Sequence, residues 1–155
     1  MRRHCIFAFA YAIAAMACGV FYREFTKFND FTGVTALGKV HTHLFMLGMA
    51  VFLFVALFDA KLGLRGQKLY KPFLILYNIG VPLASVMMLV RGVLQVAGTA
   101  LPSGADAAIS GVAGIGHVLA AAGLVLFFCM LLRGAKAADA RSAPAAGSSD
   151  SDPDA

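Results

Sequence analysis

The sequence contains few charged residues. Only 14% of its 155 positions are Asp, Glu, Lys or Arg, whereas 60% are hydrophobic, and no long polar stretch precedes the C-terminal tail. One soluble domain of this length cannot bury so much apolar surface. The low charge therefore excludes an ordinary soluble domain and indicates a protein whose solvent is lipid.

Strict alternation of polar and apolar residues is also missing, and the short tilted strands of a membrane barrel need it. Four apolar runs are present instead, at residues 5–22, 40–58, 73–96 and 107–132. Each is close to the length of about 20 helical residues that crosses a hydrocarbon layer of about 30 Å. We therefore predict an all-α integral membrane four-helix bundle, with residues 1–133 as its transmembrane domain.

The first run, MRRHCIFAFAYAIAAMACG, has features of a secretory signal. Two arginines precede it, and Ala15 and Ala17 form a small-x-small pattern that favours cleavage before Cys18. The apolar run nevertheless continues to Tyr22, which makes it longer than the usual signal core of about 7 to 15 residues. We expect this segment to be retained as a helix.

Basic residues flank the runs unevenly, and cytoplasmic flanks of membrane helices carry the excess of lysine and arginine. One side of the predicted bundle has Arg2, Arg3, Lys61, Arg65, Lys68, Lys71, Arg133, Lys136 and Arg141. The other side has fewer, and its TALPSGAD connection has none. We predict that both termini are cytoplasmic. Residues 134–155 are rich in Ala, Ser, Asp and Pro, so we expect a disordered cytoplasmic tail there.

Cysteines are scarce and carry no recognisable motif. Cys5, Cys18 and Cys129 form no CxxC pattern, so no metal or redox motif is indicated. No serine or acidic residue stands beside His117 in a pattern typical of a hydrolase. The few polar residues inside the apolar runs are therefore the main indication of function.

Five residues that can be cationic fall in or beside the outer half of the bilayer with this topology: Arg23, His41, His43, Arg91 and His117. Placing one charge in the hydrocarbon costs at least about 2.5 to 3.5 kcal/mol. His41 can be hydrated near the headgroups, and Arg91 can extend its guanidinium to the interface. His117 lies deeper and must face the bundle. The cluster therefore indicates a bound anion or a group that coordinates neutral imidazole.

His41 and His43 cannot both face the same centre, because residues two positions apart on a helix are separated by about 200°. Gly48 lies almost in line with His41. A small residue is typical of a packed helix face, so we predict that His41 is the inward ligand and that His43 points elsewhere.

Small residues leave one side of the fourth run nearly bare around His117, which is flanked by Gly114 and Gly116. Close packing of another helix is the commoner explanation of such glycines. A flat macrocycle held between helices would also need small residues beside its axial ligand. Both interpretations remain open at this point.

A family resemblance rests on the segments YAIAAMACGVFYREFTKFNDFTG, HTHLFMLGM, VRGVLQVAG and DAAISGVAGIGH. Across residues 5–133 the chain resembles a family of small four-helix bacterial integral membrane proteins known as domain of unknown function 2871. This resemblance implies a multi-pass protein of the bacterial plasma (inner) membrane and brings no activity with it.

A shorter similarity concerns the tripeptide VHT at the start of the second run. It is similar to the second helix of the catalytic subunits of nitric oxide reductases and cbb3-type haem-copper oxidases, where a His-Thr pair supplies a low-spin haem ligand. By that similarity, His41 would take the ligand role. The chain lacks the further histidines of those enzymes, so the similarity supports a haem site without oxygen or nitric oxide chemistry.

A b-type haem with two histidine ligands agrees best with these observations. Arginine is well suited to pair with the haem propionates, and axial imidazoles set the iron potential. The residues that we assign to this site are His41, His117, Arg91, Arg23, Gly114 and Gly116. We expect a role in electron transfer or in haem or gas sensing. The expected partners are the bilayer and either a second copy of the chain or a membrane redox protein; nothing suggests nucleic acid.

Two alternatives remain. A copper or other transition-metal site would use imidazole and thioether ligands, here from His41, His43, His117, Met46, Met49, Met87 and Met88. A bare metal ion would, however, leave Arg91 repelled rather than paired. A structural or regulatory bundle without a cofactor would explain the glycines and leave the histidines unexplained.

Overall fold

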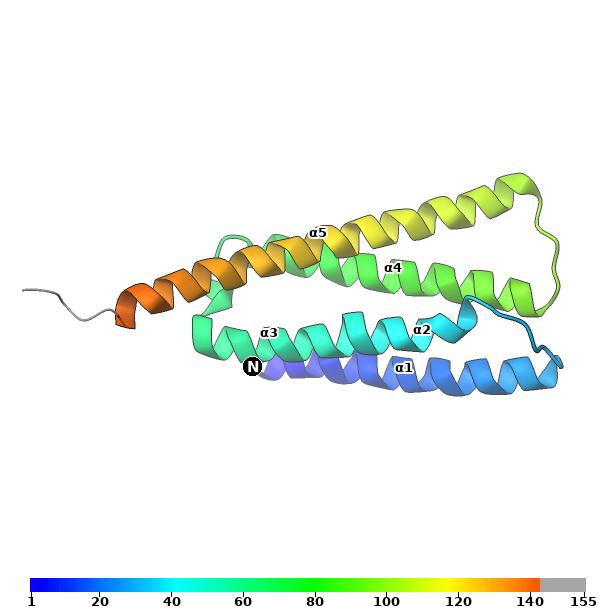
Figure 1. Cartoon of the computed structure of the whole chain (residues 1–155), viewed down its shortest axis with the longest axis horizontal. Helices are drawn as coiled ribbons and strands as arrows, with labels where there is room; N and C mark the ends of the chain where they lie inside the picture. Colours follow the sequence, from blue (N-terminus) through cyan, green and yellow to red (C-terminus); the bar gives the residue numbers. More distant parts are fainter. Residues whose placement is uncertain (143–155) are drawn as a thin grey trace, which may run out of the picture.

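The computed structural model describes residues 1–142 as four long antiparallel helical segments (Figure 1). The elements are α1 (Arg2–Phe28), α2 (Leu37–His43), the π-helical η1 (Leu44–Ala50), α3 (Val51–Leu62), the 3-10 turn η2 (Leu64–Gly66), α4 (Tyr70–Val96) and α5 (Ser103–Ser142). α2, η1 and α3 follow one another without a break, so they form one membrane-length segment. All four segments are long and apolar enough to span a membrane, which confirms the predicted all-α membrane bundle.

The helices extend beyond the predicted apolar runs at nearly every end. Hydropathy marks only the part of a helix that lies in hydrocarbon, whereas backbone hydrogen bonding continues into the interface. The largest difference is at α5, which continues to Ser142, so residues 134–142 of the predicted disordered tail are helical. Gly134 is buried there, with Leu62 and Gln67 beside its Cα. The rest of the predicted tail, residues 143–155, lies outside the described residues.

The bundle is built from two helical hairpins. α1 packs along α2, η1 and α3, and α4 packs along α5; α2 with α4 and α3 with α5 join the hairpins. The α4–α5 contact is unusually close, because a Cβ at Gly80 would meet the α5 backbone and a Cβ at Gly116 would lie 2.6 Å from the Ala84 nitrogen. Small residues let membrane helices approach in this way.

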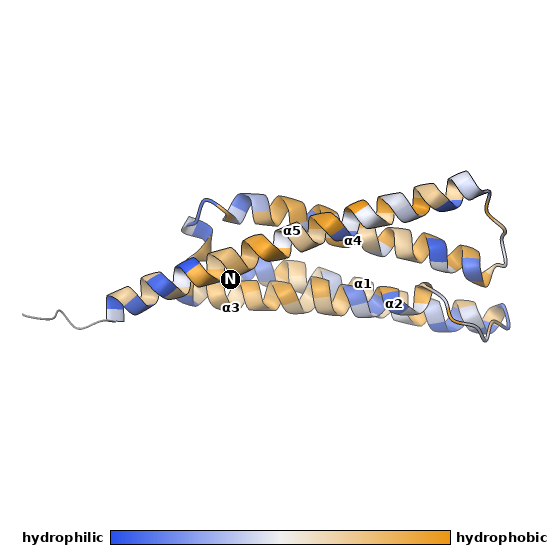
Figure 2. Cartoon of the chain, turned by 45° about the horizontal axis from the view of Figure 1, so that its top comes forward, coloured by the Kyte–Doolittle hydropathy of each residue, from blue (hydrophilic) through white to orange (hydrophobic). Residues whose placement is uncertain are grey.

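The buried apolar residues form two clusters along the bundle axis. The larger one includes Phe52, Phe73 and Met130, near the end that contains residue 1. The smaller one includes Leu37 and Val96, near the other end. Much of the outer surface is also apolar (Figure 2), as a surface in contact with lipid must be.

Residue 1 lies at the same end of the bundle as the α3–α4 connection and the C-terminal end of α5 (Figure 1). An even number of membrane-length segments accounts for this arrangement. Which side of the membrane this end faces stays a prediction, and we expect it to be the cytoplasmic side.

Cysteine labelling tests this topology in a background in which Cys5, Cys18 and Cys129 are replaced by alanine. We expect an impermeant thiol reagent outside intact cells to label Asn29→Cys and Ser103→Cys but to leave Gly66→Cys unlabelled. Gly66 is the better probe of its loop, because Gly63 has a left-handed φ of 63° and a side chain there would be strained. Lysed cells should label at all three positions. The orientation is reversed if only Gly66→Cys reacts in intact cells.

Candidate functional site

The first turn of α2 is attached to α4 by a small polar cluster. Thr35 is 5% exposed; its hydroxyl lies 3.0 Å from the carbonyl oxygen of Gly92 and accepts the N–H of Leu37 at 3.2 Å. The side-chain oxygen of Gln95 accepts the N–H of Ala36 at 2.8 Å. A Cβ at Gly92 would collide with the Leu37 backbone. These contacts hold the start of α2 against α4 and so determine where the histidines that follow are placed.

His41 lies against α1. Its ring stacks on Tyr22 with centroids 6.4 Å apart, and a Cβ at Gly19 would lie 3.7 Å from its Cγ. The predicted pairing of His41 with the α5 histidine is therefore wrong. Gly48 does mark a packed face, as expected, but that face packs on Tyr11 of α1 rather than on α5.

His43 points the other way and meets His117 of α5. The two ring centroids are 6.1 Å apart and the ring planes are 85° apart. His41 and His43 thus point in different directions, as their spacing predicts, but His43 is the one that meets the α5 histidine. His43 and His117 therefore lie at the same level of the bundle.

Hydrogen bonds determine the tautomer of both rings. Nδ1 of His43 lies 3.0 Å from the carbonyl oxygen of Lys39, and Nδ1 of His117 lies 2.7 Å from that of Ala113. A carbonyl oxygen only accepts, so each Nδ1 carries the proton. In the neutral imidazole, Nε2 is then the nitrogen with a free lone pair. In both rings, Nε2 is therefore the nitrogen that is available to coordinate a metal ion.

A cavity of about 460 Å³ contains this pair. The residues that line it are Val34, Thr35, Ala36, Lys39, His43, Met88, Gln95 and His117. His117 is exposed at the side of the bundle, so the cavity opens laterally rather than lying enclosed at the centre. Of the residues that the structure describes, Lys39 is the single lysine or arginine in this lining, and no acidic residue belongs to it.

The two arginines that we expected at the site have acidic partners elsewhere. Arg91 Nη2 lies 2.5 Å from Oδ1 of Asp106 and 2.8 Å from the Ser110 hydroxyl. Arg23 is exposed and pairs with Glu24 at 3.8 Å on α1. Neither arginine lines the cavity. Asp106 lies just before the fourth apolar run, so hydropathy gives no sign of its role, but it belongs to α5, which brings it beside Arg91.

The two glycines that we expected to leave room for a ligand behave differently. Gly116 is buried against Ala84 of α4, so it serves helix packing and not a ligand. Gly114, one turn before His117, has no atom within 4 Å of the position of a Cβ. Of these two glycines, only Gly114 leaves free space beside His117.

The donor atoms near the cavity are few. Of the four methionines considered as copper ligands, only Met88 lines it. Within residues 1–142, no group of three His, Cys, Asp or Glu side chains is arranged to hold a metal ion. The site therefore offers two imidazoles and one thioether.

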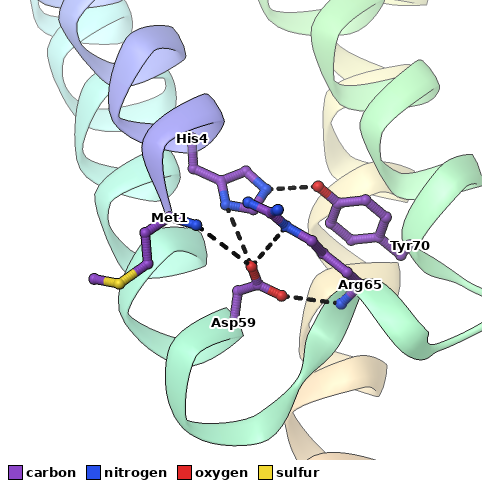
Figure 3. A network of polar contacts seen from close by, with 5 residues as sticks. All are labelled: Met1, His4, Asp59, Arg65 and Tyr70. Carbon is purple, nitrogen blue, oxygen red and sulfur yellow. Dashed lines mark hydrogen bonds and ion pairs between the residues drawn. The ribbon is translucent and has the colours of Figure 1, made fainter.

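A second polar cluster lies at the end of the bundle that contains residue 1 (Figure 3). His4 is completely buried, and its Nε2 lies 2.6 Å from the Tyr70 hydroxyl. Its Nδ1 is 3.7 Å from Asp59 Oδ2, and Asp59 in turn pairs with the Arg65 Nε at 2.8 Å and accepts the Arg65 N–H at 3.0 Å. The α-amino group of Met1 is 4.0 Å from the same carboxylate. The cluster joins α1, α3 and α4.

Sequence reasoning missed this cluster, although a signal was present. His4 directly precedes the first apolar run and Asp59 directly follows the second, so the predicted topology already placed both at one end of the bundle. Tyr70, just before the third run, lies at that end as well.

No curated protein and no solved structure matches the chain in the corresponding comparisons. A family model described as "Protein of unknown function (DUF2871)" matches residues 1–134. These residues contain α1 to α4 and α5 as far as Gly134. The chain therefore belongs to the DUF2871 family.

Proposed function

We propose that this protein binds a b-type haem between α2 and α5, with His43 and His117 as axial ligands. The observation that carries the proposal is the geometry of the two imidazoles, whose centroids are 6.1 Å apart. Imidazole nitrogens bind metals at about 2.0 to 2.1 Å, so two rings on opposite sides of one metal ion have centroids about 6 Å apart. Each Nδ1 is bonded to its own helix, which leaves Nε2 for the iron.

The number of ligands favours haem over a bare metal ion. Haem iron is already bound by the macrocycle and needs only axial ligands from the protein, whereas protein sites for zinc use three or four side chains. The described residues supply two imidazoles and no third His, Cys, Asp or Glu. Two histidines are sufficient for the first kind of site and too few for the second.

The surroundings of the pair also suit a macrocycle. The cavity volume of about 460 Å³ falls in the range of small-molecule sites, and its lateral opening lets one edge of the ring extend toward lipid. The open space at Gly114 adds clearance beside His117. Lys39 replaces Arg91 and Arg23 as the cation for a propionate, and the Gln95 amide is a second donor in the same lining.

We infer electron transfer as the role of this haem. Two histidine ligands leave the iron without an open coordination position, which favours electron transfer over gas binding. The partner would be a membrane redox protein or a second copy of the chain. The proposed location, by family resemblance, is the plasma (inner) membrane of a bacterium.

Spectra of histidine variants test this proposal. Protein purified in mild detergent from haem-replete cells should show a Soret band and sharp reduced α and β bands. We expect His43→Ala and His117→Ala to lose these bands, because each removes one axial ligand. His41→Ala is the matched control, two positions away on the same helix, and should keep them.

Two results would contradict the proposal. Loss of the haem in His41→Ala with retention in His43→Ala would restore the assignment made from sequence alone. A colourless wild-type protein that takes up neither haem nor metal on reconstitution would leave a structural bundle without a cofactor.

Copper(I) is the second candidate, and the position of Met88 favours it. Thioether and imidazole ligands suit copper(I), and Met88 lines the same cavity as His43 and His117. Met88→Leu separates the two candidates. A haem protein should keep its spectrum in this variant, whereas a copper site should lose stoichiometric metal in elemental analysis.

A further inference from the structure

A basic groove lies at the end of the bundle that contains residue 1. It has a volume of about 700 Å³ and runs between the start of α1 and the start of α4. Among the described residues, four cations line it, namely Arg3, Arg65, Lys68 and Lys71, and no acidic residue does. The groove therefore concentrates positive charge.

Within residues 1–142, only one of these cations has an ion-pair partner. Arg65 pairs with Asp59, whereas Arg3, Lys68 and Lys71 form no ion pair within residues 1–142. The hydrogen bond between His4 and Tyr70 joins the start of α1 to the start of α4, and Arg3 is next to His4 in the sequence. The buried cluster of Figure 3 thus holds Arg3 on the same groove as the two lysines.

The lining changes from basic to apolar along α4. Leu74 and Ile75, one turn beyond Lys71, belong to the same groove, and Ile75 is 60% exposed. These residues lie within the apolar segment that can span the membrane, close to its first residue, Tyr70. A ligand that fills the whole groove must therefore have an anionic head and an apolar body.

We propose that this groove binds an anionic phospholipid, with its phosphate held by Arg3, Lys68 and Lys71 and its acyl chains over Leu74 and Ile75. Arginine and lysine are the usual phosphate ligands, and basic pockets at membrane helix ends bind anionic lipid headgroups. The apolar continuation selects a lipid over a free phosphate. The proposal is independent of the proposed haem site, which lies toward the other end of α4.

Lipid binding to the full-length protein in detergent tests the proposal. Native mass spectrometry would count phosphatidylglycerol and phosphatidylcholine retained at equal concentrations. We expect phosphatidylglycerol to be retained preferentially, and Lys68→Gln/Lys71→Gln to bind it about 10- to 30-fold more weakly. Both lysines are exposed, so this variant should fold, which an unchanged size-exclusion profile would verify.

Lys61→Gln/Arg133→Gln is the matched control. It removes the same charge from the same end of the bundle, at exposed positions outside the groove, and should bind within about twofold of wild type. Equal losses in the two double variants would overturn the proposal in favour of general surface attraction. Equal retention of both lipids would also overturn it, as would full competition by glycerol phosphate, which would identify a site for free phosphate.

Discussion

Gly80→Ala is expected to destabilise the bundle, although alanine is the better helix former. A Cβ at this position would meet the backbone nitrogen of Ala120 and would lie 2.8 Å from the Gly116 oxygen and the Leu119 carbonyl carbon. All three are backbone atoms of α5, so no side chain can move aside and the two helices must separate. Overpacking of this kind costs about 1 to 3 kcal/mol and sometimes more, against a propensity gain of about 1 kcal/mol.

Thermal stability in detergent would measure this effect, as the temperature at which half of the protein leaves the monodisperse size-exclusion peak. Gly114→Ala is the matched control, because a Cβ there meets nothing within 4 Å. It should be as stable as wild type or more stable by up to about 1 kcal/mol. If Gly80→Ala and Gly114→Ala behave alike, the close approach of α4 and α5 is incorrect.

Asp59→Ala is the second substitution from which we expect a large loss of stability. The carboxylate is 8% exposed and interacts with the Arg65 side chain and the Arg65 N–H. Its Oδ2 also lies 3.7 Å from Nδ1 of the buried His4, an atom that has no hydrogen-bond partner within residues 1–142. A hydrogen bond to a charged group contributes about 1.5 to 3 kcal/mol, so we expect a loss of about that size.

Asp106→Ala is the control for this substitution within the same protein. Asp106 also pairs with an arginine, Arg91, but its side chain is 58% exposed at the opposite end of the bundle. Exposed ion pairs contribute about 0 to 1 kcal/mol. In the same thermal assay, Asp59→Ala should therefore lose more stability than Asp106→Ala, and the loss in Asp59→Asn should lie between the two. Equal and small effects would mean that the cluster around His4 does not hold α1 to the bundle.

Much of the architecture could be predicted from the sequence, and the reason is the solvent. A helix in lipid must satisfy all its backbone hydrogen bonds internally and must present apolar side chains along its length. Four apolar runs therefore determined four membrane-length helices. The separation of His41 from His43 was equally secure, because it follows from helix geometry within one segment.

The neighbour of each helix face was decided only by the tertiary structure. Sequence spacing placed His41 and Gly48 on one packed face. It could not say which helix that face contacts; in the structure His41 lies against α1, whereas His43 meets His117 of α5. Glycines at contacts between distant segments determine these neighbours. Because Gly92 has no side chain, α2 can pack against α4 there, and because Gly80 has none, α5 can pack against α4. His43, rather than His41, consequently meets His117. The pairing of Arg91 with Asp106 and the hydrogen bond between His4 and Tyr70 were also decided by the tertiary structure. Such pairings depend on how the helices are arranged in space and not on the periodicity of any one helix.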